Sequence, residues 1–539
     1  MANGGYSGFI VSGIGLSPDI NEAEACRIAA SELKRAGVSP ARLHFSIYKR
    51  SVDARKKSDI KIVYSVAARA DAPMERSLPV GKKYRIAALI DEELQVVKGT
   101  EKSSAPPLVV GMGPAGLFGA LLLAENGYRP IIIDRGDCVA ERSRKYETFK
   151  TLGILDTESN IQFGAGGAGT FSDGKLLTRI NDPKISYVLR RFCDFGAPEE
   201  IMTAAKPHIG TDLLLGIVDR MLCEIERLGG RAMYSTRLDG MRELPDGNVA
   251  VRTTAGELIC SSVRLAPGPR ARDTYTMLLE NGYAIEAKSF SVGVRVEHLR
   301  ENIDKALYGD MAGHPALGKG EYHLSDTSSG RGVYTFCMCP GGEVVAAASE
   351  EGGVVVNGMS CNARDGVNSN SAVAVSVNRS DYDGTPMGAI AFQRNIERAA
   401  FREGGADYCA PMMTVGDLLS GKWGSEPTDV LPTYRGGLVR PVSFEKIFPS
   451  FISEELKRGL VSFERKLTGF ASPTAVLTGV ETRTSAPVRI LRGEDLRALG
   501  RGAIYPCGEG AGYAGGITSA AIDGLRVALR IMEQFAPCE

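Results

Sequence analysis

The fold is decided by the stretch Leu108-Val109-Val110-Gly111-Met112-Gly113-Pro114-Ala115-Gly116. Its three leading apolar residues predict a short buried strand, which runs directly into a Gly-x-Gly-x-x-Gly turn. A helix is predicted over residues 117–126, closed by Gly127, and a second strand follows over residues 130–133. A strand, a glycine turn, a helix and a second strand in this order indicate a Rossmann-like, dinucleotide-binding α/β fold.

Each position of this pattern has a physical reason. Gly111 allows a tight turn, Gly113 lets the backbone approach a pyrophosphate, and Gly116 lets the helix pack closely on the strand. The helix N-terminus offers free N–H groups and the positive end of its dipole to phosphates. Asp134, directly after the second strand, can accept hydrogen bonds from ribose hydroxyls and would repel a 2′-phosphate. The pattern therefore suits FAD or NAD.

A second glycine-rich segment covers residues 160–175, with Gly166-Gly167-Ala168-Gly169-Thr170 at its centre. Small residues are needed where backbone N–H groups lie against a flat ring system. The segment resembles the loop that passes the isoalloxazine ring and the pyrophosphate in the succinate dehydrogenase-like branch of FAD enzymes. A flexible loop is the alternative, which the bounded central run disfavours.

Two further segments favour FAD over NAD. A helix over 213–228, a strand over 231–238 and a hairpin ending at Ala266-Pro267-Gly268 resemble an insertion of FAD folds, in which the strand lies by the adenine. Near the C-terminus, a strand ends in Gly508-Glu509 and a glycine-rich turn leads into a helix at Ile517. This resembles the second FAD fingerprint, in which the acid binds ribitol hydroxyls and the helix N-terminus points at the flavin.

The residues predicted to bind the cofactor share these segments. They are Gly111, Gly113, Pro114, Ala115, Gly116, Asp134, Arg135, Arg142, Gly166, Gly167, Ala168, Gly169, Thr170, Arg237, Leu238, Pro267, Gly268, Gly508, Glu509, Gly516 and Ile517. The sequence contains one complete Gly-x-Gly-x-x-Gly unit, so no separate nicotinamide domain is expected. If NAD(P)H is the electron donor, it must visit the flavin transiently.

The chain is similar to a family of bacterial and plastid FAD-dependent dehydrogenases that carry an N-terminal ferredoxin-like domain. The residues that carry this resemblance are 51–57, 160–176, 206–212, 332–342, 357–360 and 505–524. It implies an N-terminal ferredoxin-like α+β domain over 1–98 and an FAD-binding domain in two parts, 105–290 and 481–539. Residues 291–480 would form a discontinuous substrate domain. Ala165 and Pro269-Arg270 depart from the family pattern, which has Glu and His-Ser there.

The N-terminal residues support a small α+β domain on their own. A helix is predicted over 21–36 and half-buried strands over 43–49 and 60–67. Residues 49–57 then form a basic loop, which could contact an anion or RNA. A solvated hairpin tip is the favoured interpretation, because short charge runs are commonly on the surface.

Three residues are candidates for catalysis. His208 could act as a general acid or base, or could make a hydrogen bond at a helix entry. Arg270 could hold a substrate carboxylate through a bidentate fork, or could be solvated. Cys337 could belong to a redox or substrate-thiol site with Cys339. A Cys-x-Cys on a strand places both side chains on one face, and we favour buried thiols that act as small hydrophobes.

Composition narrows the function. Lys+Arg and Asp+Glu both total 64, so the zero net charge gives no indication of nucleic acid or membrane as a partner. The 11 cysteines lack metal-ligand spacing, so no metal is expected, and no signal peptide is recognised, which favours the cytoplasm. The sequence predicts no oligomeric state. The leading hypothesis is an FAD-dependent oxidoreductase of a small organic substrate. An RNA-linked flavoprotein and a non-catalytic flavin-binding sensor are the alternatives.

Overall fold

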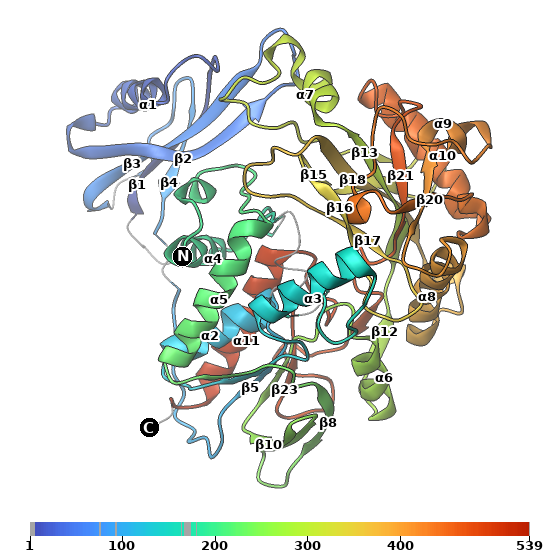
Figure 1. Ribbon diagram of the computed structural model, residues 1–539. Coiled ribbons are helices and arrows are strands. Elements are labelled where there is room, and N and C mark those ends of the chain that lie inside the picture. The colour runs from blue at the N-terminus through green and yellow to red at the C-terminus, as the bar shows by residue number, and fades with distance from the viewer. Residues whose placement is uncertain are drawn as a thin grey trace. The chain divides into compact units, whose positions relative to one another are not determined.

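The computed structural model describes residues 6–74, 77–91, 94–162, 164–165, 174–178 and 180–537. The chain divides into two compact units (Figure 1). Unit 1 comprises Met1–Gln95, Pro183–His208 and Asp304–Gly320. Unit 2 comprises Val96–Asp182, Ile209–Ile303 and Glu321–Glu539. Two later segments therefore join the N-terminal residues in unit 1, an association that the sequence did not predict.

Unit 1 is built on a four-stranded antiparallel sheet in the order β2-β3-β1-β4. Its elements are β1 (Tyr6–Leu16), α1 (Ala23–Arg35), β2 (Leu43–Asp53), β3 (Lys61–Met74), β4 (Arg85–Leu89) and α4 (Lys184–Asp194). Helix α1 buries Ala25, Ala29 and Leu33, which share the core of unit 1 with the strands. The interpretation of residues 49–57 as a loop was wrong in part, because β2 continues to Asp53 in register with β3.

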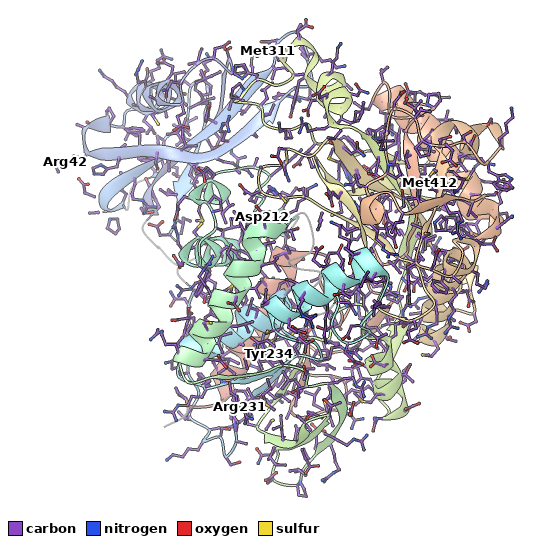
Figure 2. All side chains as sticks on the ribbon, in the orientation of Figure 1. Arg42, Asp212, Arg231, Tyr234, Met311 and Met412 are labelled. Atoms are coloured by element: carbon purple, nitrogen blue, oxygen red, sulfur yellow. The ribbon has the colours of Figure 1, made fainter. Side chains whose placement is uncertain are left out.

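A five-stranded parallel sheet lies in unit 2, in the order β23-β11-β5-β6-β7. Its strands are β5 (Leu108–Val110), β6 (Ile131–Ile133), β7 (Arg231–Met233), β11 (Val263–Leu265) and β23 (Ile504–Pro506). Helix α2 (Pro114–Glu125) lies beside it and contacts both α5 (Thr211–Arg227) and α11 (Ile517–Gln534) (Figure 1). Asp212 in the first turn of α5, labelled in Figure 2, accepts a hydrogen bond from the backbone N–H of Asn362 at 2.8 Å. The parallel sheet and the helices beside it confirm the predicted α/β fold.

Between β7 and β11, the chain forms a separate antiparallel sheet of three strands. It consists of β8 (Leu238–Glu243), β9 (Val249–Thr253) and β10 (Gly256–Cys260). The single strand predicted over 231–238 is instead divided between β7 and β8, because Ser235 adopts a left-handed conformation with φ 48°. The hairpin predicted to end at Ala266-Pro267-Gly268 instead ends at Cys260, and β11, which follows it, belongs to the parallel sheet.

The largest sheet of unit 2 has seven strands in the order β14-β15-β18-β13-β21-β19-β20. These strands are β13 (Phe290–Leu299), β14 (Ser325–Asp326), β15 (Val333–Cys339), β18 (Asn368–Val377), β19 (Ala410–Thr414), β20 (Val439–Pro441) and β21 (Val476–Glu481). The central strands β13 and β18 are buried along nearly their whole length, so both faces of the sheet are covered. Helices α8 (Pro386–Glu403) and α10 (Ser450–Lys466) contact this sheet (Figure 1).

The other α-helices and strands complete the described structure. They are α3 (Val139–Leu152), α6 (Arg272–Glu280), α7 (Arg300–Tyr308), α9 (Val415–Ser420), β12 (Ile285–Ala287), β16 (Glu343–Ala346), β17 (Val356–Met359) and β22 (Val488–Ile490). None of the helices in the described part of the chain combines the length and apolar character needed to cross a bilayer.

Candidate functional site

A cavity of about 330 Å³ lies within unit 2 at the carboxyl ends of parallel strands. Val110 ends β5 and Ile133 ends β6, while Ala266 follows β11 and Cys507 follows β23. All four residues line the cavity. Open α/β sheets bind ligands outside the carboxyl ends of their strands, so this cavity has the position expected of a ligand site.

The glycines of the first turn serve two different purposes. A Cβ at Gly111 would lie 2.2 Å from the carbonyl oxygen of Ala266, and a Cβ at Gly116 would lie 1.8 Å from that of Gly111. These two glycines let the backbone segments touch. A Cβ at Gly113 would meet no described atom within 4 Å. Gly113 lines the cavity and precedes α2, so its missing side chain leaves room beside the helix N-terminus.

Asp134 is a buried carboxylate that is held by three donors. It accepts the backbone N–H groups of Met112 at 2.9 Å and Gly136 at 3.0 Å, and it pairs with Arg142 at 2.8 Å. Arg142 is fully buried and also donates to the carbonyl of Asn160 at 3.0 Å. Asp134 lines the cavity, whereas Arg142 and Gly116 are not among its lining residues. Arg142 thus orients the Asp134 carboxylate without itself lining the cavity.

Arginines on the cavity wall near Asp134 are engaged with acidic partners. Arg135 pairs with Glu158 at 2.7 Å and with Asp273 at 2.6 Å. Arg237 shares Glu158 at 3.0 Å and also contacts Asp239 at 2.9 Å. Further predicted cofactor residues on the lining are Pro114, Ala115, Leu238, Pro267 and Gly268.

The C-terminal fingerprint reaches the same cavity. Gly508, Glu509, Gly516 and Ile517 all line it, and α11 begins at Ile517. Burial raises the pKa of the Glu509 carboxyl above its usual range, against the opposing positive charge of Arg270. The structure thus brings the first and last predicted segments of the fingerprint to one place.

Other predicted residues are not among the lining residues that the structure describes. Gly166, Gly167, Ala168, Gly169 and Thr170 lie outside the residues that the structure describes. His208 is half-buried in unit 1, whereas the cavity is lined by residues of unit 2. Its role as a general acid or base stays a prediction.

Arg270 lines the cavity with a side chain that is buried, so the interpretation as a solvated arginine was wrong. Its Nη2 donates to the carbonyl oxygen of Arg483 at 3.2 Å. Burial lowers the pKa of Arg270 to about 10, although Glu509 opposes this shift.

Cys337 also lines the cavity, but not in the way that strand alternation predicts. The backbone at Cys337 has φ 44°, and the pairing of β15 with β18 shifts register between Phe336 and Cys339. The neighbours Phe336 and Cys337 therefore both line the cavity, while Cys339 is buried. The prediction that the two thiols share one face in a regular strand was wrong, because it assumed an unbroken period of two.

Three polar lining residues belong to no motif that the sequence shows: Glu481, Arg483 and Thr484. Two of them belong to buried ion pairs. Glu481 pairs with Arg295 at 2.8 Å, and Arg483 pairs with Glu397 at 2.8 Å. Three further polar lining residues lie in segments that the sequence singles out: Gln162 and Lys175 in residues 160–175, and Asn357 in residues 357–360.

Comparisons with known proteins identify the class of protein. Residues 289–484 match a family model described as "FAD-dependent protein, C-terminal domain-like", and residues 11–69 match a domain of unknown function. An uncharacterised protein of Clostridium beijerinckii is 43% identical over 526 residues, which cover 97% of this chain and 98% of that protein. The chain therefore belongs to this family of FAD-dependent proteins, and its cofactor is FAD.

Solved structures resemble the chain more distantly. A flavin-dependent halogenase, CmlS, has 13% sequence identity and a TM-score of 0.36, with 80% of this chain and 59% of that one covered. An aklavinone-11 hydroxylase solved with FAD and aklavinone has 14% identity and a TM-score of 0.33, covering 80% and 63%. The chain thus spans about three fifths of the length of each of these structures.

Proposed function

We propose that this protein is an FAD-dependent oxidoreductase of a small organic molecule and that FAD binds in the unit 2 cavity. The observation that carries the proposal is the convergence of two helix N-termini, those of α2 and α11, on a cavity at the ends of parallel strands. Helix N-termini present unpaired N–H groups and a positive dipole end, which suit the pyrophosphate and an electron-rich ring system.

The residues present fit such a cofactor. Gly113, Gly268, Gly515 and Gly516 all line the cavity, and a Cβ at any of them would meet no described atom within 4 Å. A wall without side chains leaves space for a long, partly flat ligand to lie against the backbone. This is the fit expected of a dinucleotide, and it supports the placement of FAD in this cavity.

FAD, when bound, supplies the hydride chemistry, so the protein has to bind, orient and shield the reacting groups. Asp134 is held rigidly by its three donors and is positioned to accept hydrogen bonds from ribose hydroxyls. Glu509 would hold ribitol hydroxyls at the other end of the site. A raised pKa favours the protonated form of Glu509, which can donate as well as accept.

We further propose that NAD(P)H reduces the flavin transiently, as in a dehydrogenase, and that the protein works in a reducing, cytoplasmic compartment. The ten cysteines in the described part of the chain are free thiols, which supports such a compartment. We also infer that unit 1 contains a ferredoxin-like domain, because its sheet has the order β2-β3-β1-β4 with α1 after β1.

The test begins with the visible absorbance spectrum of the purified protein, followed by denaturation and identification of the released cofactor. We expect a flavin spectrum and free FAD. Anaerobic titration with NADH and with NADPH should then bleach the spectrum with one donor at a lower concentration. A protein that neither contains nor takes up FAD would overturn the proposal. Firmly bound flavin that no donor reduces would favour a non-catalytic sensor.

A further inference from the structure

Arg270 is a buried cation on the cavity wall that has no acidic partner among the described residues. Its side chain is only 7% exposed. A guanidinium carries five N–H donors, yet Arg270 makes one hydrogen bond, to a backbone carbonyl, and it forms no ion pair with any described residue. Its Nε is buried without a hydrogen-bond partner among these residues. Buried charges are normally paired, because their desolvation is costly.

The neighbouring guanidinium groups follow this rule. Arg272 and Arg483 share the carboxylate of Glu397, with contacts of 2.8 Å from each. Arg295 pairs with Glu481 at 2.8 Å. These carboxylates are therefore already committed to other arginines, and Arg270 is left without one.

Glu509 does not fill this role. It is the acidic group with the largest electrostatic effect on Arg270, but the two side chains form no ion pair in the described structure. Burial raises the pKa of Glu509, which favours its neutral form. No described carboxylate therefore forms an ion pair with the Arg270 guanidinium on this wall of the cavity.

We propose that Arg270 binds the carboxylate of the substrate, so that the protein acts on small organic carboxylates. This inference rests on the proposed function and names the substrate class of the same cavity. A guanidinium presents two parallel N–H groups that match a carboxylate, and a water-poor wall strengthens the interaction. Phe336 lines the same cavity with a partly exposed ring, which supplies an apolar surface for the body of the substrate.

Benzoate and its neutral analogue benzamide are the probes. We expect benzoate to perturb the flavin absorbance of the wild-type holoprotein with a Kd at least about tenfold below that of benzamide. Arg270→Met should weaken benzoate binding by at least about tenfold and leave benzamide within about threefold. Arg458→Met is the matched control, since Arg458 lies on the surface of α10 and is 58% exposed. It should change neither affinity.

Two results would overturn the proposal. One is a wild-type protein that binds benzoate no better than benzamide. The other is an Arg270→Met variant that keeps its benzoate affinity but loses at least about tenfold in FAD affinity, which would assign Arg270 to the cofactor. The variant's FAD content is therefore measured by fluorescence of the cofactor released on denaturation.

Calorimetric titration of benzoate into the protein provides a readout that does not need the flavin. If the protein takes up no FAD but binds benzoate through Arg270, the proposed function fails and the carboxylate site stands. Thermal unfolding provides a second readout. Loss of an unpaired buried cation should leave the Tm of ligand-free Arg270→Met unchanged or higher, whereas Arg272→Met, which breaks an ion pair, should lower it. A large drop in the Tm of Arg270→Met alone would mean that Arg270 has a structural partner, and would overturn the proposal.

Discussion

The cavity of unit 2 is bounded by two walls of different chemistry. The glycine wall presents backbone and open space, and it comprises Gly111, Gly113, Gly268, Gly508, Gly515 and Gly516. The arginine wall presents the side chains of Arg270, Glu481 and Arg483. On the glycine wall the essential property is the absence of a Cβ, whereas on the arginine wall it is the balance of buried charge.

The difference teaches how each wall can be damaged. Adding a single carbon to the glycine wall either disrupts the fold or blocks the cavity, depending on which glycine receives it. Removing one charge from the arginine wall leaves the shape of the cavity nearly intact. The oppositely charged partner of the removed group is then left buried without its ion pair. Substitutions can therefore separate the two walls experimentally.

The largest expected effect comes from Glu397→Gln. Glu397 is 1% exposed and binds Arg272 and Arg483 together, so its loss leaves Arg483 without an ion-pair partner among the described residues and leaves Arg272 with Glu350 alone. We expect the free energy of unfolding to fall by about 3–5 kcal/mol, measured by urea denaturation. Glu445→Gln is the control, because Glu445 is 64% exposed and the loss of its pair with Lys457 should cost about 1 kcal/mol or less. Equal losses would contradict this account of the arginine wall.

The stability that Glu397 contributes with Arg272 and Arg483 should also depend on pH. Burial alone would raise the pKa of Glu397, but Arg272 and Arg483 together lower it well below its usual range. A lowered pKa means that the stabilisation is present above the ordinary carboxyl pKa, about 4.3, and is lost as the pH falls further. The wild-type protein should thus lose stability more steeply below pH 4.3 than Glu397→Gln.

Gly111→Ala and Gly113→Ala separate the two kinds of glycine on the other wall. Gly111 has φ 97° and a Cβ there would lie 2.2 Å from a backbone oxygen, so Gly111→Ala should cost about 2–4 kcal/mol of stability. Gly113→Ala should cost about 1 kcal/mol or less, because its Cβ would enter open space. Its FAD affinity should nevertheless fall by at least about tenfold, measured by fluorescence titration. If Gly113→Ala binds FAD as tightly as the wild-type protein, the placement of FAD against the glycine wall would be wrong.

A fourth test concerns the sheet that supports the arginine wall. His298 lies on β13, three residues after Arg295, and its ring contacts the carbonyl of Phe470 at 2.7 Å. Burial lowers the pKa of His298 to about 4. The unfolded chain binds a proton near pH 6.5 that the folded chain excludes, so stability should decline by roughly 3 kcal/mol between pH 6.5 and 4. Urea unfolding of His298→Gln should show a flatter profile in this window, and an unchanged slope would contradict the assignment.

The two walls also differ in how far the sequence predicts them. The residues of the glycine wall lie within short segments, and a local pattern such as Gly111-x-Gly113 reports a local backbone geometry. The ion pairs behind the arginine wall join residues far apart in the sequence, such as Arg272 with Glu397, so no local sequence pattern predicts them. The buried state of Arg270 likewise depends on tertiary packing. The prediction from strand alternation was wrong at Cys337, because no sequence pattern predicts the register shift between Phe336 and Cys339.

The smallest expected effect is that of Cys337→Ser. The contribution of Cys337 to the described structure includes its carbonyl, which accepts a hydrogen bond from Arg295 at 3.0 Å, and a serine keeps that group. Stability should change by about 1 kcal/mol or less, and the rate of anaerobic flavin reduction by less than about threefold, because the flavin carries the hydride chemistry. Cys337→Val should be less stable than Cys337→Ser, since a β-branched residue is poorly tolerated at φ 44°. A Cys337→Ser variant of normal stability that has lost flavin reduction would instead place the thiol in the chemistry, on the wall where we expect only charge and shape to matter.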